Sequence, residues 1–176
     1  MAKGINRANP RFLYEFSSAS RSQICVFISH KSEDVAAAKE VADRVMAAGL
    51  DVYLDIFDGE LQKATREDNA RGIVSGIERA LARSTNILVL VTDKTRQSWW
   101  VPYEIGFSKR GDKGIASLLL KSTDDFPDYL KIERTLRNGT ELNTYLSELT
   151  RKAGNPLSES AINALPSHGL FEYIRR

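Results

Sequence analysis

Residues 97–108, with the sequence QSWWVPYEIGFS, combine two indole rings and one carboxylate at the predicted start of a helix. Pro102 fixes its own φ angle near the helical value and lacks an N–H group, so we expect the helix to begin within a residue or two of Val101. Glu104 then lies in the first turn, where the positive end of the helix dipole favours an ionised carboxylate. The four-residue spacing puts Glu104 on the same face as Trp100.

An ionised carboxylate beside an exposed indole suits a substrate in which a flat cationic ring is attached to a sugar. The indole can stack on the ring while the carboxylate faces the anomeric carbon. Nicotinamide riboside chemistry fits this description, because a pyridinium leaves as neutral nicotinamide and one carboxylate is enough, whereas an ordinary glycosidase needs two. The pattern also has a purely structural interpretation, in which Trp100 is a hydrophobic staple and Glu104 serves only the helix dipole.

The composition argues against several classes of protein, among them nucleic-acid-binding and membrane proteins. With 176 residues, 42% of them hydrophobic and 27% charged, the chain is long enough for one full core. The net charge is +2 and the sequence has no basic run of the kind that tracks phosphates, so we do not expect nucleic acid as a partner. No apolar run approaches the roughly 20 residues that span a bilayer. The start of the chain also lacks the apolar core of a signal peptide, so we expect a cytoplasmic protein without a membrane partner.

Several kinds of chemistry are not predicted. Cys25 is the single cysteine and lies inside an apolar run, which favours a buried, inert thiol. No group of Cys and His residues has metal-ligand spacing, so no metal site is expected. No GxGxxG follows the first strand and no GK[ST] is present, which argues against dinucleotide oxidoreductases and NTPases. We therefore expect no bound cofactor.

Apolar runs alternate with helical patterns along the chain. Buried strands are predicted at residues 24–28, 50–54, 87–91 and 115–120, and a short edge strand within 129–136. Helices are predicted at residues 35–46, 73–81 and 99–108, and a last one begins at a Thr140 cap. Gly49 is the expected C-terminal cap of the first helix. Residues 56–68, which are charged and include Gly59, are predicted to form a long, mobile loop.

This alternation implies an α/β fold, with a parallel sheet of about five strands and helices on both faces. Ligands bind such sheets outside the carboxyl ends of the strands. Residues 29–32, Asp55 and residues 92–104 all follow carboxyl ends, so we expect three segments to converge at one edge. The predicted organisation is an N-terminal extension (1–22), a single central domain (23–152) and a C-terminal extension (153–176).

Three short segments resemble the signature boxes of TIR (Toll/interleukin-1 receptor) domains. They are residues 26–30 (VFISH) before a helix, residues 52–55 (VYLD) before a loop, and the pair Trp100 and Glu104. The resemblance covers residues 23–152 and implies a flavodoxin-like fold. One branch of this family, common in bacteria, cleaves NAD+. The resemblance therefore implies a TIR-domain NAD+ glycohydrolase or ADP-ribosyl cyclase, a hydrolase for which NAD+ is the substrate, as in Thoeris-type antiphage defence.

The resemblance also implies roles for individual residues. In the NAD-cleaving branch the motif glutamate is catalytic, which implies this role for Glu104. Trp100 then stacks on the nicotinamide or on another base. Substrate contacts are implied for three residues that follow the first strand, Ser29, His30 and Lys31, and Lys31 can meet the pyrophosphate.

Four other positions have weaker functional interpretations. Asp55 is interpreted equally well as a cap at the end of its strand and as a substrate contact. His30 can act as an acid or base, but cleavage of NAD+ needs neither, which favours a binding role. Trp99 lies outside the motif and is predicted to be a buried anchor. His168 is predicted to be a surface residue.

The partners implied by the resemblance are other TIR domains and a downstream effector that senses the product. Residues 56–68 are expected to dock on a neighbouring domain, and a head-to-tail contact of this kind can grow open-ended assemblies. Two alternatives remain. One is a non-catalytic TIR scaffold that acts through TIR–TIR interaction, although a scaffold has no need of the Glu104 carboxylate. The other is an enzyme similar to nucleoside deoxyribosyltransferases, which share the layout and a carboxylate.

Overall fold

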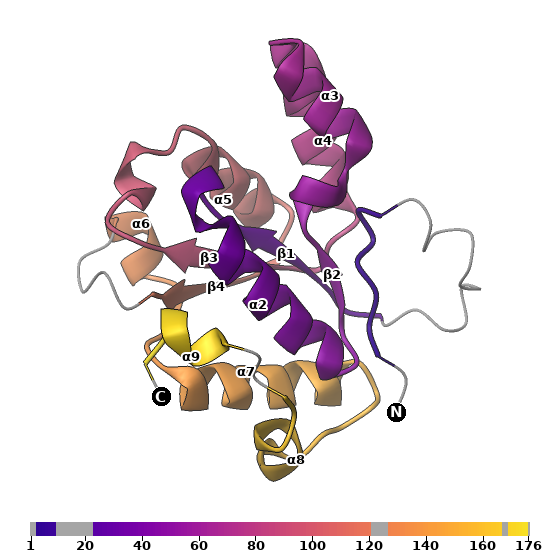
Figure 1. The fold of residues 1–176 in the computed structure, drawn as a ribbon, viewed down its shortest axis with the longest axis vertical. Helices are drawn as coiled ribbons and strands as arrows, with labels where there is room; N and C mark the ends of the chain where they lie inside the picture. Colours follow the sequence, from indigo (N-terminus) through magenta and orange to yellow (C-terminus); the bar gives the residue numbers. More distant parts are fainter. Residues whose placement is uncertain (1–2, 10–22, 121–126, 167–168, 176) are drawn as a thin grey trace.

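The structure is a computed structural model that describes residues 3–9, 23–120, 127–166 and 169–175 (Figure 1). These residues form one parallel sheet with the strand order β2-β1-β3-β4-β5. The strands are β1 (Cys25–Ser29), β2 (Asp51–Tyr53), β3 (Asn86–Val91), β4 (Gly114–Leu119) and β5 (Arg134–Leu136). This order confirms the predicted flavodoxin-like fold, and the strand order reverses between β1 and β3.

Both faces of the sheet are buried, which explains the continuous apolar runs of the central strands. Alternate residues of a strand face opposite sides. Val26 and Ile28 of β1 belong to one hydrophobic cluster, and Cys25 and Phe27 to the other. As predicted, the Cys25 thiol is fully buried, and this burial raises its pKa to about 11.

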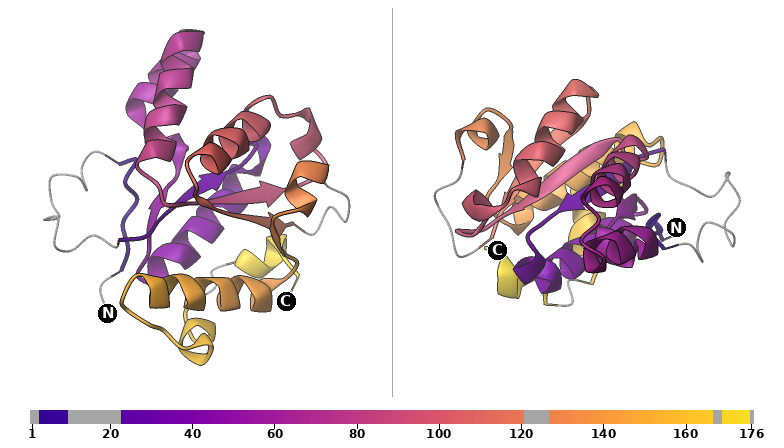
Figure 2. Two further views of the ribbon diagram at one scale, coloured as in Figure 1. Left: turned by 180° about the vertical axis from the view of Figure 1, so that it is seen from behind. Right: turned by 90° about the horizontal axis from the view of Figure 1, so that it is seen from above.

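Helices cover the two faces of the sheet (Figures 1 and 2). One face packs against α2 (Val35–Ala47), α7 (Gly139–Lys152) and the short α8 (Glu159–Asn163) and α9 (Leu170–Tyr173). The other face packs against α3 (Gly59–Arg66), α4 (Ala70–Ala82), α5 (Trp100–Arg110) and α6 (Asp128–Lys131). Three short 3-10 helices, η2 (Ser32–Asp34), η3 (Asp55–Phe57) and η4 (Thr95–Gln97), follow the carboxyl ends of β1, β2 and β3.

The predicted helix ends are partly right. Gly49 adopts a left-handed conformation with φ of 82° after α2, so its predicted role as a terminator is confirmed. The prediction that Thr140 caps the last helix is wrong. The cap of α7 is Asn138, whose side-chain oxygen accepts a hydrogen bond from the Glu141 N–H (2.9 Å). Asn and Thr are both good caps, so sequence alone could not separate positions two residues apart.

The segment predicted to be a mobile loop, residues 56–68, is mostly helical. The Asp58 carboxylate accepts hydrogen bonds from the N–H groups of Glu60 and Leu61 (both 3.1 Å) and starts α3. Only Leu61 and Ala64 of α3 are buried, which is why the helical pattern was too weak to detect. Helices α3 and α4 form a hairpin that projects from the body of the domain (Figures 1 and 2).

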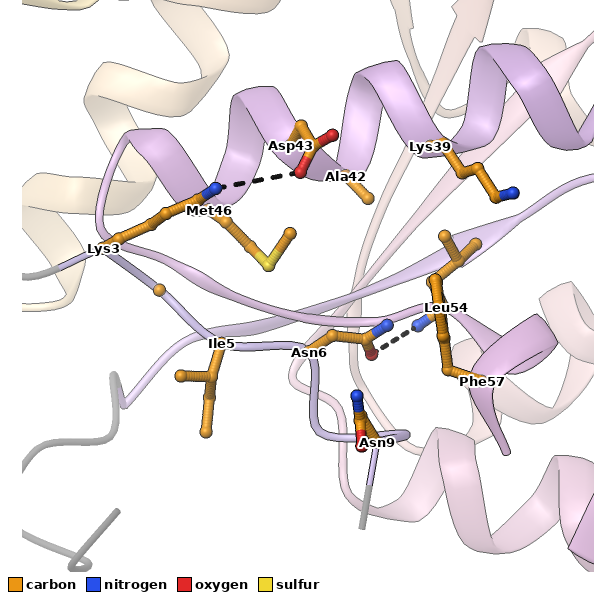
Figure 3. Close-up of a pocket in the computed structure, with 11 residues that line it drawn as sticks. Lys3, Ile5, Asn6, Asn9, Lys39, Ala42, Asp43, Met46, Leu54 and Phe57 are labelled. Atoms are coloured by element: carbon orange, nitrogen blue, oxygen red, sulfur yellow. Dashed lines mark hydrogen bonds and ion pairs between the residues drawn. The ribbon is translucent and has the colours of Figure 1, made fainter. Parts of the chain in front are cut away.

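Residues 3–9 lie along the edge of the sheet next to β2. The Ile5 N–H donates to the Asp51 carboxylate (3.1 Å), and Asn6 forms an isolated parallel bridge with Val52. A largely apolar hollow of about 430 Å³ lies between this segment, α2 and Phe57 (Figure 3). Phe12, Tyr14 and Phe16 of the N-terminal extension lie outside the described residues, as does His168.

The C-terminal segment packs onto the domain core. Ile162, Leu170 and Ile174 are buried in the hydrophobic cluster that also contains α2 and α7. The buried guanidinium of Arg44 donates to the backbone carbonyls of Ile162 (2.7 Å) and Leu165 (2.6 Å). An arginine on α2 thus satisfies backbone groups of the segment that follows α7.

Candidate active site

Helix α5 carries the residues that the sequence singled out for chemistry. The Ser98 hydroxyl accepts a hydrogen bond from the Val101 N–H (3.2 Å), and Pro102 lies in the first turn, so the predicted helix start is confirmed. Glu104 is the fifth residue of α5, and the prediction that it lies in the first turn is wrong. It lies one turn beyond Trp100 on the same face.

Glu104 is buried, with only 6% of its surface exposed. The Ser29 hydroxyl, at the end of β1, donates a hydrogen bond to Glu104 Oε2 (2.6 Å). Burial raises the pKa of Glu104 to about 8, the hydrogen bond from Ser29 opposes this shift, and the charge of Asp55 adds to it. The expectation that the helix dipole keeps Glu104 ionised is therefore wrong, because loss of solvation outweighs an effect that is confined to the first turn.

A cavity of about 500 Å³, within the usual size range of ligand pockets, opens at the carboxyl ends of β1 and β2. Its walls come from the segment after β1, from η3, from the α3–α4 hairpin and from the start of α5. The three segments expected to converge therefore meet at one edge of the sheet. Five of the six predicted site residues line the cavity: His30, Lys31, Asp55, Trp100 and Glu104. Ser29 is 1% exposed and touches Glu104 from within the core.

His30 and Asp55 lie side by side in this cavity. His30 Nδ1 donates to the Ile28 carbonyl (3.2 Å) and lies 3.9 Å from Asp55 Oδ1. Within the described part of the chain, Asp55 Oδ1 accepts no hydrogen bond, although this atom is shielded from solvent. Burial raises the pKa of Asp55, the charge of His30 and the backbone N–H groups of Ile56 and Asp55 oppose the rise, and the charge of Asp58 adds to it.

Lys31 supplies an ammonium group at the same edge. Its Nζ lies 3.5 Å from Glu33 Oε1, so part of its charge is neutralised by a neighbouring carboxylate. Its side chain is largely buried and lines the cavity. A phosphate group that enters the cavity can replace the Glu33 carboxylate as the partner of the Lys31 ammonium group.

Two indole rings face the cavity from the start of α5. Trp100 is 39% exposed and makes an edge-to-face contact with Tyr103, with ring centroids 6.2 Å apart. The Tyr103 hydroxyl donates to Glu78 of α4, which connects the two walls. Trp99 is 91% exposed, so the prediction of a buried anchor is wrong. A run of two aromatic residues does not show which ring packs inward.

The wall formed by the α3–α4 hairpin was not predicted. Leu61, Gln62 and Thr65 of α3 and Ile73 and Ile77 of α4 line the cavity. The sequence contains a usable signal in Asp58, a capping residue three positions before Leu61. Within the described ranges, no cluster of three or more His, Cys, Asp or Glu residues is arranged to hold a metal ion.

The fold and this cavity define an α/β domain of the flavodoxin type with a ligand site at the switch point of its sheet, in which an indole and a buried carboxylate lie one helical turn apart. A family model for the TIR-like domain of the Thoeris protein ThsB matches residues 27–125, more than half of the chain. The chain belongs to this family. Membership supports a TIR-type role in antiphage defence and favours TIR–TIR interaction.

A search of curated proteins gives no match to the chain. Among the described helices, none is both long and apolar enough to cross a membrane.

Proposed function

We propose that this TIR domain cleaves the bond between nicotinamide and ribose in NAD+. The observation that carries the proposal is that Trp100 and the buried carboxyl group of Glu104 face one cavity from the same side of α5. An indole can stack on the flat cationic ring, and a carboxylate beneath it stabilises the positive charge that develops on the ribose. NAD+ is a substrate in this proposal and not a cofactor.

The high pKa of Glu104 fits a site that receives a cation. Burial raises the pKa of the Glu104 carboxyl group to about 8, which favours its protonated form. A nicotinamide cation close to Glu104 favours the ionised form, because an opposite charge within a few ångströms lowers a carboxyl pKa. Substrate binding thus generates the carboxylate that the reaction needs.

The remaining lining residues supply the polar contacts of a dinucleotide. We assign Lys31 to the pyrophosphate, and His30 and Asp55 to ribose hydroxyl groups. The products are nicotinamide and ADP-ribose or a cyclic ADP-ribose derivative. Such a product is a signal for a downstream effector.

A non-catalytic TIR scaffold is the second candidate function. The 91% exposure of Trp99 and the projecting α3–α4 hairpin favour it, since both provide surface for a neighbouring TIR domain. Burial of Glu104 argues for catalysis, because a scaffold gains nothing from a carboxyl group that costs free energy to bury.

The decisive experiment is incubation of the purified protein with NAD+, followed by mass spectrometry of the products. We expect nicotinamide and an ADP-ribose species from the wild-type protein. Glu104→Gln preserves the size and shape of the side chain and removes its charge, so nicotinamide release should fall at least about a hundredfold. A folded Glu104→Gln variant with wild-type turnover would exclude this role, and an inactive wild-type protein that self-associates in light scattering would favour the scaffold.

A further inference from the structure

A second carboxyl group shares the cavity with Glu104. Asp55 Oδ1 is shielded from solvent and accepts no hydrogen bond from any described residue, although the whole side chain is 28% exposed. An acceptor in this state costs free energy unless a ligand supplies a donor. Asp55 and Glu104 also lie close enough for the charge of one to raise the pKa of the other.

The proposed reaction has a second half that needs an acceptor of this kind. When the C–N bond breaks, its electron pair leaves with nicotinamide, which departs neutral and takes no proton. The ribosyl cation is then captured by a hydroxyl oxygen, either of water or of the ADP-ribose itself. The captured hydroxyl must lose its proton, and a positioned base accelerates this step.

Three other polar atoms of the cavity, Glu104 Oε2, His30 Nδ1 and Lys31 Nζ, are engaged elsewhere. Glu104 Oε2 already accepts the Ser29 hydroxyl hydrogen, and its charge is needed beneath the ribosyl cation. His30 Nδ1 donates to the Ile28 carbonyl, so this nitrogen carries a hydrogen and cannot accept one. Lys31 is a cation beside Glu33.

We propose that Asp55 is the catalytic base that takes the proton from the hydroxyl group that captures the ribosyl cation. The inference rests on the proposed cleavage of NAD+ and deepens it. The hydroxyl oxygen forms a bond to the anomeric carbon, its O–H bond breaks, and the proton passes to the Asp55 carboxylate and then to solvent. His30, held by the Ile28 carbonyl, positions the aspartate through its nearby ring.

The test compares two acceptors in the same protein. Hydroxyl capture is measured as ADP-ribose, or as a cyclic product whose new bond to the anomeric carbon is made by a hydroxyl oxygen, and nicotinamide return is measured as incorporation of deuterated nicotinamide into NAD+. Nicotinamide attacks through a ring nitrogen that has no proton to lose, and by microscopic reversibility it uses the same cavity. Only hydroxyl capture therefore needs a base.

We expect Asp55→Asn to lower hydroxyl capture at least about a hundredfold while label exchange stays within about threefold of the wild-type rate. Asp55→Ser, which removes the carboxylate with a smaller side chain, should behave in the same way. Glu104→Gln should lose both reactions. Asp93→Asn removes an exposed carboxylate that follows β3 at the same edge of the sheet but does not line the cavity, and it should retain both.

Each other result has a distinct meaning. A parallel loss of capture and exchange in the Asp55 variants would show that Asp55 only supports the structure or binds substrate, and would overturn the inference. Retained capture in the Asp55 variants would overturn it as well. A wild-type protein that does neither reaction would refute the proposed function itself.

Discussion

At the scale of single residues, the hydrogen bond from Ser29 to Glu104 connects a β-strand terminus to the chemistry proposed for α5. The hydroxyl is within 2.6 Å of a carboxyl oxygen whose pKa burial raises to about 8, and the bond favours the ionised form. Ser29 is thus a positioning residue, since it lies in the core and does not line the cavity.

Replacement of Ser29 by alanine should move the pH dependence of NAD+ cleavage. Without the donated hydrogen bond a larger share of Glu104 is protonated at any given pH. The acidic limb of the profile of kcat/KM against pH should therefore move to higher pH by about one unit. Ser117→Ala removes another buried strand hydroxyl, one that does not touch Glu104, and should leave the limb unchanged. An unshifted profile for Ser29→Ala would contradict the positioning role.

The raised pKa of Glu104 also predicts how stability varies with pH. Between about pH 4.5 and pH 8 the folded protein holds a proton on Glu104 that the unfolded chain lacks, so this residue makes stability fall as the pH rises through this window. Glu104→Gln cannot ionise. We therefore compare the Tm of Glu104→Gln with the wild-type Tm at two pH values. The variant should be the more stable protein at pH 8.5, and its advantage there should be at least about 5 °C greater than at pH 5. A constant Tm difference across this range would show that the carboxyl group is not desolvated.

At the scale of elements, the strands were predictable because they are continuous apolar runs buried on both faces. Helix α3 was missed because only Leu61 and Ala64 are buried. For the same reason the hairpin wall of the cavity could not be predicted. The sequence singled out Trp100 and Glu104 as candidate site residues, but the exposure of Trp99 and the raised pKa of Glu104 depend on tertiary packing, which residue types do not encode.

The start of α3 provides a test of the corrected assignment. If residues 56–68 were a mobile docking loop, a proline at Gly59 would disturb docking, yet Gly59 is the first residue of a helix, where proline is favoured. Asp58 has an extended backbone, with φ of −81° and ψ of 99°, that tolerates a following proline. Gly59→Pro should leave the Tm unchanged or slightly higher, whereas Gly76→Pro in the interior of α4 should cost about 3 kcal/mol. Equal destabilisation in thermal unfolding would contradict the helical assignment.

At the scale of the whole molecule, the polypeptide that follows α7 completes the core. The hydrophobic cluster under α2 and α7 includes Ile162, Leu170 and Ile174. The Arg44 guanidinium donates hydrogen bonds to the backbone carbonyls of Ile162 and Leu165. The sequence shows these residues only as scattered apolar positions after a proline-containing turn, so their burial became clear only in the folded chain.

Removal of this segment should therefore destabilise the domain, although the TIR-like family match ends well before it. A chain that ends at Gly154 loses three buried aliphatic side chains and leaves the Arg44 guanidinium without its carbonyl partners. Truncating one buried aliphatic residue commonly costs 2–5 kcal/mol, so the loss should be a large fraction of the total free energy of unfolding. Urea unfolding of the shortened and full chains measures it. Ile162→Ala, which removes one side chain and keeps the Arg44 contacts, should fall between them. Coincident unfolding curves would show that residues 155–176 are an independent appendage.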